Sequence, residues 1–321
     1  MLALAAVVLG AVAAVRAVFP DTSAPAADPH GPRIVVVIPS GTDASGIGSI
    51  LQDRGVIDSG SRFRDYAKSQ GQGSDFKAGK YAFKAGTGYD AIISALDKGA
   101  VYQLEKTLVI PEGYRITQIA DTVPSVGISK RAYLRAVAHA SPPPGFGHPH
   151  SMEGFMFPAT YTVRPGETAR TLVAQQLAAF EQNFSQVDMS YAKSKNLTNY
   201  DVLKIASMIE REAYIPNDRP KIAAVIYNRL HDGMTLGIDA TLLYQYGSWT
   251  HQLTQSELVA DTPYNTRVRH GLPPTPICNP GLASMQAASR PAHVDYLYYV
   301  ANGHGGHYFT ASYQDFLNHG G

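Results

Sequence analysis

The sequence predicts an α+β protein in which an apolar amino-terminal segment precedes about two folded domains. Three observations lead to this class. Runs typical of short strands alternate with amphipathic helices from residue 33 onward, one strand-to-helix turn occurs twice with a similar sequence, and the second half holds longer helices around a loop rich in Pro and Gly. A length of 321 residues is typical of about two domains.

Composition and charge argue against several kinds of function. The formal net charge of +1 gives no basic field of the kind that binds nucleic acid. The single cysteine, Cys278, excludes a disulfide framework and a cysteine-based zinc site within one chain.

Residues 1–19 are apolar except for Arg16. Because about 20 apolar residues span a membrane, we expect a membrane anchor here, with a cleaved signal peptide and a buried core helix as alternatives. No basic residue precedes the apolar stretch, although the cytoplasmic flank of an anchor normally carries Lys or Arg. We therefore expect an upstream start that encodes a basic lead. Residues 20–32 are expected to form a flexible tether.

Residues 33–140 are predicted to form a small α+β region. Strands are expected at Arg33–Ile38 and Gly79–Phe83, and helices at Thr42–Asp53, Ser61–Gln70 and Gly88–Lys98. The turn Ile38–Gly41 and its counterpart Ile110–Gly113 each follow a strand and precede a helix, which indicates an internal repeat. Units of this kind suit a binding module, and a plain scaffold is the equally open alternative.

The breaker-rich segment 141–150 is interpreted as a linker between domains. Residues 151–321 contain their own amphipathic helices and apolar strands, so they are expected to fold by themselves. Their elements are predicted as helices at 168–184, 198–214 and 220–233, strands at 296–300 and 307–310, and a short helix at 313–319. Residues 262–281 are too rich in Pro and Gly for regular structure, and such a loop is usually functional.

The helix predicted at Thr198–Tyr214 carries the main catalytic candidate. Thr198 is its expected cap, with Asp201 completing a variant of the capping box. In helical geometry, Glu210 stacks with Leu203, Ala206, Ser207 and Tyr214. A carboxyl group on such a partly apolar face of small residues is expected to keep its proton near neutral pH and to act as a general acid. A glutamate exposed to water is the alternative.

Two further arrangements of carboxyl groups are considered. Glu212 is expected to point away from Glu210 and, together with Arg211, to be solvated. A glycosidase with two carboxyl groups would pair Glu210 with Asp239 or with Glu153, and the sequence leaves this pairing open.

Metal and triad chemistry fit the residues poorly. His304 and His307 do not have the spacing of a zinc motif, so no metal site is expected. Ser207 with His231 and Asp239 would make a poor triad, because Ser207 falls within a helix and not on a sharp turn.

Six stretches of the chain match the motifs of one family in order. They are EGFMFPATYTV at 153–163, IASMIEREA at 205–213, IYNRLHDGMTLGIDATLLYQYG at 226–247, PYNT at 263–266, GLPPTPICNPG at 271–281 and YLYYVANGHGGHYFT at 296–310. The chain thereby resembles the YceG-like family of membrane-anchored endolytic murein transglycosylases, often called MltG. The resemblance implies an anchor at 1–19, a LysM-like murein-binding region at 33–140 and an α+β catalytic domain at 151–321.

The resemblance also implies a reaction. The family's catalytic acid falls on Glu210, which would protonate the glycosidic oxygen between N-acetylmuramic acid and N-acetylglucosamine and then deprotonate the C6 hydroxyl, leaving a 1,6-anhydro end. No cofactor is implied. A muramidase-type hydrolase and a non-catalytic murein-binding protein remain alternatives. The resemblance also implies a location: a single-pass protein of the plasma membrane with its catalytic domain outside. There it would act on nascent strands beside murein synthases.

The groove that the resemblance implies would be lined by four residues: Asp239, Thr241, Tyr264 and Asn265. Glu153 is a further candidate for contact with substrate. Thr241 and Asn265 are equally suited to hold loops by hydrogen bonds, and Glu153 is equally suited to a structural role. The chain departs from the family pattern at Ala159, Gly237 and Ala240.

Overall fold

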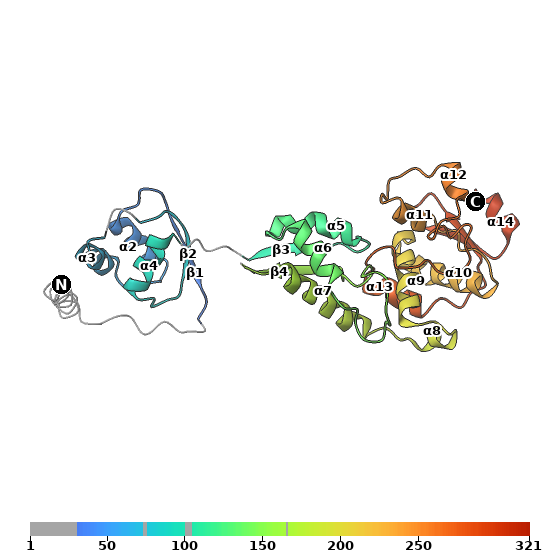
Figure 1. The fold of residues 1–321 in the computed structure, drawn as a ribbon, viewed down its shortest axis with the longest axis horizontal. Helices are drawn as coiled ribbons and strands as arrows, with labels where there is room; N and C mark the ends of the chain where they lie inside the picture. The colour runs from blue at the N-terminus through green and yellow to red at the C-terminus, as the bar shows by residue number, and fades with distance from the viewer. Residues whose placement is uncertain (1–30, 73–75, 100–104, 165) are drawn as a thin grey trace. The chain divides into compact units, whose positions relative to one another are not determined.

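The computed structural model describes residues 31–72, 76–99, 105–164 and 166–321. By their contacts they form two units, Met1–Leu104 and Glu105–Gly321, which are described separately (Figure 1). The predicted anchor at 1–19 and nearly all of the predicted tether lie outside the described residues. Within the part that is described, no helix is both long and apolar enough to cross a membrane.

The first unit is an antiparallel pair of strands packed with helices. Its elements are β1 (Ile34–Ile38), α2 (Ala44–Asp53), α3 (Gly60–Ser69), β2 (Gly79–Phe83) and α4 (Tyr89–Lys98). Val36 faces Tyr81 in the sheet, and both side chains are buried in the core. Helices α2 and α3 touch through glycines, since a Cβ on Gly48 would lie 2.4 Å from the carbonyl oxygen of Gly60. The predicted elements of this region are confirmed with small shifts of their ends.

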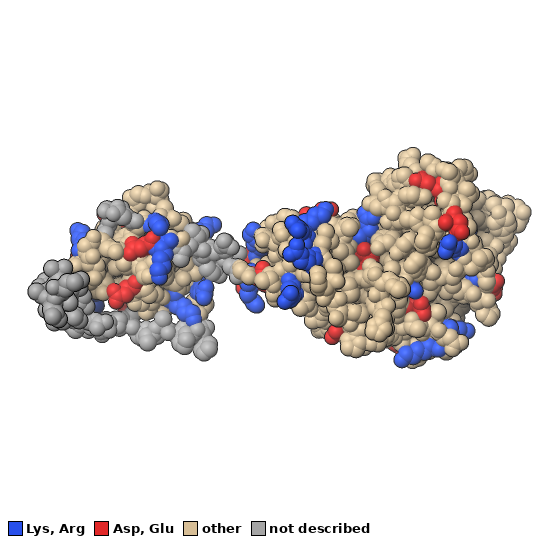
Figure 2. Space-filling model, viewed as in Figure 1, with Lys and Arg blue, Asp and Glu red and all other residues tan. Residues whose placement is uncertain are grey.

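The second unit begins by repeating this order of elements. Its first strand, β3 (Lys106–Val109), pairs antiparallel with β4 (Thr160–Val163), and α5 (Ile116–Thr122), η1 (Val123–Val126) and α6 (Lys130–Ala138) lie between them in sequence. The turn after the first strand is alike in both units, because Gly41 has a φ of +79° and Gly113 a φ of +78°. The predicted repeat is therefore present. Figure 2 shows Lys and Arg side chains gathered over α5 and α6.

The structure places the domain boundary elsewhere than at the predicted linker, residues 141–150. The division falls between Leu104 and Glu105, because β3 pairs with β4 across the predicted linker. Phe146, in the middle of that segment, is buried among three other phenylalanine rings at centroid distances of 4.8–5.3 Å. Residues 151–321 alone lack this strand and part of the core, which argues against the prediction that they fold by themselves.

The rest of the second unit is organised around α9 (Asn199–Glu212), against which α10 (Arg219–His231) and α13 (Leu282–Ser289) pack. The other elements are α7 (Ala169–Phe184), α8 (Ser190–Ser194), η2 (Pro216–Asp218), α11 (Asp239–Gln245), α12 (Gln255–Val259), β5 (Tyr298–Ala301), β6 (His307–Thr310) and α14 (Tyr313–Asn318). Thr198 and Asp201 form the predicted capping box. The helix ends before Tyr214, because the backbone of its capping residue Ala213 is extended, with φ −84° and ψ 111°.

Removal of residues 105–150 is expected to unfold the remainder of the second unit. The deletion removes Ile119 and Tyr133, both 0% exposed, and uncovers their partners. Burial of one such large apolar side chain contributes roughly 1.5–3 kcal/mol, whereas a whole domain is stable by only about 5–15 kcal/mol. In thermal unfolding followed by circular dichroism, the fragment Glu105–Gly321 should melt cooperatively and the fragment Ser151–Gly321 should not. Equal melting of the two fragments would contradict this account.

Candidate active site

The carboxyl group of Glu210 lies in the last turn of α9 and is almost completely buried, with its side chain 7% exposed. Its Oε2 accepts a hydrogen bond from the Gly281 N–H at 3.0 Å, and its Oε1 lies 3.9 Å from Nη2 of Arg219. Gly281 is the residue that caps the start of α13, so the carboxyl group lies at the positive end of that helix. These contacts fix one carboxyl group where α9, α10 and α13 meet.

The loop 262–281, which forms no helix or strand as predicted, covers the small face of α9. Ala206 and Ser207 are fully buried on that face. The Ser207 hydroxyl accepts a hydrogen bond from the Ile277 N–H at 3.0 Å, so the end of the loop lies directly on the helix. The loop therefore packs against these small residues, and it places Gly281 beside the catalytic candidate, Glu210.

The surroundings of two residues that follow Glu210 in the sequence, Glu212 and Tyr214, were predicted wrongly. Tyr214 does not cover Glu210, because it lies beyond the end of the helix and is 82% exposed. Glu212 is not solvated with Arg211. Its carboxylate accepts a hydrogen bond from the Tyr299 hydroxyl at 3.2 Å, and burial raises its pKa to about 7. Arg211 instead stacks on an indole ring, 4.1 Å from the ring centroid.

The turn before α5 contributes a second carboxyl group that sequence reasoning missed. Glu112 lies so close to Gly281 that a Cβ added there would be 1.8 Å from its Oε1. Burial and the negative charge of Glu210 raise the pKa of Glu112, although the nearby charge of Arg219 opposes the shift. The repeat holds the signal that points to it, because the first unit has Ser40 where the second has Glu112.

Glu153, predicted to contact substrate, is the centre of a buried hydrogen-bond network. It is 4% exposed. Its carboxylate accepts hydrogen bonds from the Ile116 N–H at 3.0 Å, from Nδ2 of Asn279 at 2.9 Å and from the Tyr244 hydroxyl at 3.4 Å. Burial raises its pKa to about 7. This geometry favours the structural role that the sequence left open, and a substrate contact stays a prediction.

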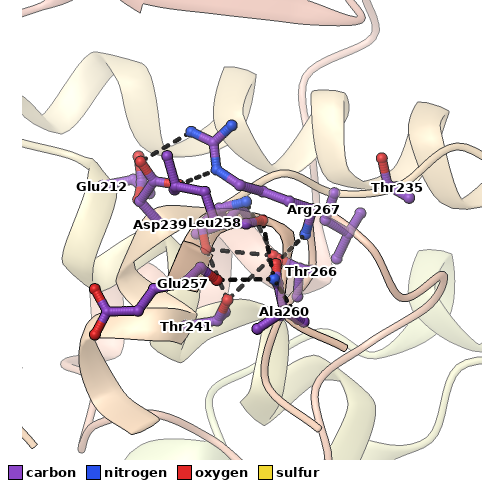
Figure 3. A network of polar contacts seen from close by, with 12 residues as sticks. Glu212, Thr235, Asp239, Thr241, Glu257, Leu258, Ala260, Thr266 and Arg267 are labelled. Atoms are coloured by element: carbon purple, nitrogen blue, oxygen red, sulfur yellow. Dashed lines mark hydrogen bonds and ion pairs between the residues drawn. The ribbon is translucent and has the colours of Figure 1, made fainter. Parts of the chain in front are cut away.

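Thr241 (Figure 3) and Asn265, both fully buried, hold loops together. The Thr241 hydroxyl donates to the carbonyl oxygen of Ile238 at 2.7 Å. The Asn265 amide donates to three backbone carbonyl groups at the end of α12, at 2.8–3.3 Å. The geometry therefore favours the loop-holding alternative for both residues.

Asp239 and Tyr264 complete the predicted set. Asp239 is partly exposed and pairs with Arg267, whose Nη2 donates to Oδ2 at 3.0 Å (Figure 3). The Tyr264 hydroxyl is hydrogen-bonded to that of Thr275 at 2.8 Å. The negative charge of Asp239 contributes to the raised pKa of Glu212.

At the three positions where the chain departs from the family pattern, the local backbone suits the residue that is present. Gly237 has a φ of +66°, a conformation that favours glycine, and its N–H donates to the carbonyl of Thr266 at 2.8 Å. Ala240 is 6% exposed. Ala159 takes part through its carbonyl oxygen, which accepts from the Ile110 N–H at 2.9 Å, and so independently of its side chain.

Comparison with known proteins places these features in a family. The model of the YceG-like family matches residues 36–320, and the chain belongs to this family. A protein of Bacillus subtilis named endolytic murein transglycosylase is 34% identical over 297 residues, covering 87% of this chain and 81% of that protein. A Streptococcus pneumoniae protein of the same name is 33% identical over 313 residues, which cover 88% of this chain. The match spans 56% of the pneumococcal protein's length.

A solved structure agrees with the mixed α+β fold. The crystal structure of a YceG-like protein from Listeria monocytogenes is 32% identical and superposes with a TM-score of 0.59. The match covers 89% of this chain and 98% of the Listeria chain.

The free energy of unfolding is expected to fall as the pH rises from about 4.5 to about 7. Glu153 and Glu212 each have a pKa raised from 4.5 to about 7 in the folded protein. The folded state therefore holds their protons more tightly, and stability is lost as they ionise. In urea unfolding across this range, Glu153→Gln and Glu212→Gln should each flatten the slope, whereas the exposed Glu181→Gln should not. Identical slopes in all variants would contradict the desolvation of both groups.

Proposed function

We propose that the chain is an endolytic murein transglycosylase that cleaves glycan strands between N-acetylmuramic acid and N-acetylglucosamine. The observation that carries this proposal is the 7% exposed carboxyl group of Glu210, held by Gly281 in a segment within the family match. The names of the Bacillus and Streptococcus relatives support the same activity.

In this mechanism Glu210 acts first as an acid and then as a base. Protonated Glu210 gives its proton to the glycosidic oxygen, and the bond from that oxygen to C1 of N-acetylmuramic acid breaks. The C6 hydroxyl of the same sugar then bonds to C1, and its proton returns to Glu210. The product is a 1,6-anhydro end, and no water enters. A hydrolase would instead need a second carboxyl group to activate water or to attack C1. Glu112, beside Gly281, is the observation that keeps this alternative worth testing.

The amino-terminal parts are proposed to bring this activity to its substrate. We infer that residues 1–19 anchor the chain in the plasma membrane with the rest outside, on the strength of their apolar sequence. We infer that residues 33–140 include LysM-like elements that bind murein. The strand–helix–helix–strand order of β1, α2, α3 and β2, repeated by β3, α5, α6 and β4, supports this. Action on nascent strands beside murein synthases is part of the same proposal.

Glu210→Gln is expected to reduce cleavage of purified murein by about 100-fold or more, the usual scale for a positioned acid–base group. Gln is nearly isosteric and still accepts the hydrogen bond from Gly281, so the melting temperature should change little. The matched control is Glu181→Gln, a substitution of an exposed residue on α7. It should cut murein at the wild-type rate.

Mass spectrometry of the wild-type digest separates the two reactions. Transglycosylation should give muramic ends lighter by one water than the ends of a hydrolase. If the Glu210→Gln variant were fully active, Glu210 would not be the acid. Hydrolytic ends from the wild type would overturn the reaction type.

A further inference from the structure

Glu112 is brought to Glu210 by the second copy of the repeated turn. A Cβ on Gly113, the next residue, would lie 3.6 Å from Cγ of Glu210. The Glu112 carboxyl group itself lies against Gly281, whose N–H binds Glu210. Two carboxyl groups from segments about a hundred residues apart therefore meet at the start of α13.

The Glu112 carboxyl group has no structural partner of its own. Within the described ranges, no N–H or O–H group donates a hydrogen bond to it, and it is in no ion pair. The charged groups that act on it are Glu210 from α9 and Arg219 from α10, and it lies at the amino-terminal end of α13. Arg211 lies beside the next residue, Gly113. Turn formation does not require an acid at this position, since the first unit makes the same turn with Ser40.

We propose that Glu112 is a positioning residue for the acid, and that Glu112 and Glu210 share one proton until the glycosidic bond breaks. This inference rests on the proposed function and specifies how the acid keeps its proton. Two carboxyl groups that both lie against Gly281 do not readily ionise together, so the first proton lost leaves the second one more tightly held. The direction of the Glu112 pKa shift agrees with such a pair.

The shared proton leaves through Glu210 to the glycosidic oxygen as the bond to C1 breaks. During that step both carboxyl groups are negative and face the positive charge that develops on the sugar ring. When the C6 oxygen bonds to C1, its proton returns to the pair. The enzyme regains its starting state, and no water or other reactant is consumed.

Glu112→Gln removes the neighbouring charge with little change in size. The alkaline limb of the pH–kcat profile for release of 1,6-anhydro ends should move to lower pH by about one unit, which is about tenfold less activity on that limb. The KM and the melting temperature should stay close to wild type. Glu112→Asp, which keeps the charge, should restore most of the profile.

Gly281→Ala tests the same contact without altering either carboxyl group. The backbone of Gly281, with φ −77° and ψ 171°, is open to any residue, so the new methyl group acts by displacing Glu112. This variant should shift the alkaline limb as Glu112→Gln does. Gly88→Ala is the matched control, because Gly88 also caps a helix in extended backbone and has nothing within 4 Å of an added Cβ.

If both Glu112→Gln and Gly281→Ala show the wild-type pH profile, the proposal that the two carboxyl groups share a proton is wrong. The proposed function would still stand if the wild-type enzyme produces 1,6-anhydro ends. Absence of those ends from the wild type would overturn both. A readout independent of cleavage is a titration of the Glu112 side chain by carboxyl-carbon NMR. The pKa of Glu112 should fall when Glu210→Gln removes the neighbouring charge, and an unchanged value would also overturn the proposal.

Discussion

The arrangement of residues around Glu210 depends on the buried side chain of Asn279. Its Oδ1 accepts hydrogen bonds from the Gly154 and Met156 N–H groups at 3.0 and 2.8 Å. Its Nδ2 donates to the carbonyl oxygen of Tyr114 and to Glu153, at 2.8 and 2.9 Å. One fully buried amide thus joins three segments distant in sequence, and each of its bonds is costly to lose because no water replaces it.

The position of Glu210 follows from this junction. The backbone carbonyl of Asn279 accepts from the Gly113 N–H at 2.9 Å, which fixes the turn that carries Glu112. Two residues after Asn279, the Gly281 N–H reaches Glu210. Glu153 belongs to the same network, and burial raises its pKa although its role there is structural. A raised pKa therefore does not by itself identify a catalytic carboxyl group in this molecule.

Local sequence patterns predicted the parts of the structure that depend on local interactions. The capping box of α9, the repeat and the irregular loop 262–281 were all readable, because caps, periodicity and breakers act within a few residues. The domain boundary could not be predicted in this way, because β3 pairs with β4 across the Pro-rich segment that resembles a linker. The burial of Glu212 and the approach of Glu112 to Glu210 are tertiary contacts, which helical spacing cannot reveal.

A crystal structure of the Glu210→Gln protein with a murein glycan bound would show whether Glu210 meets the scissile bond. We expect the oxygen between N-acetylmuramic acid and N-acetylglucosamine to lie within about 3 Å of the side chain at position 210. We also expect the C6 hydroxyl to lie on the same side of the ring and the Glu112 carboxyl group to face the sugar. A glycan whose scissile oxygen lies over Glu212 or Asp239, away from the start of α13, would contradict this expectation.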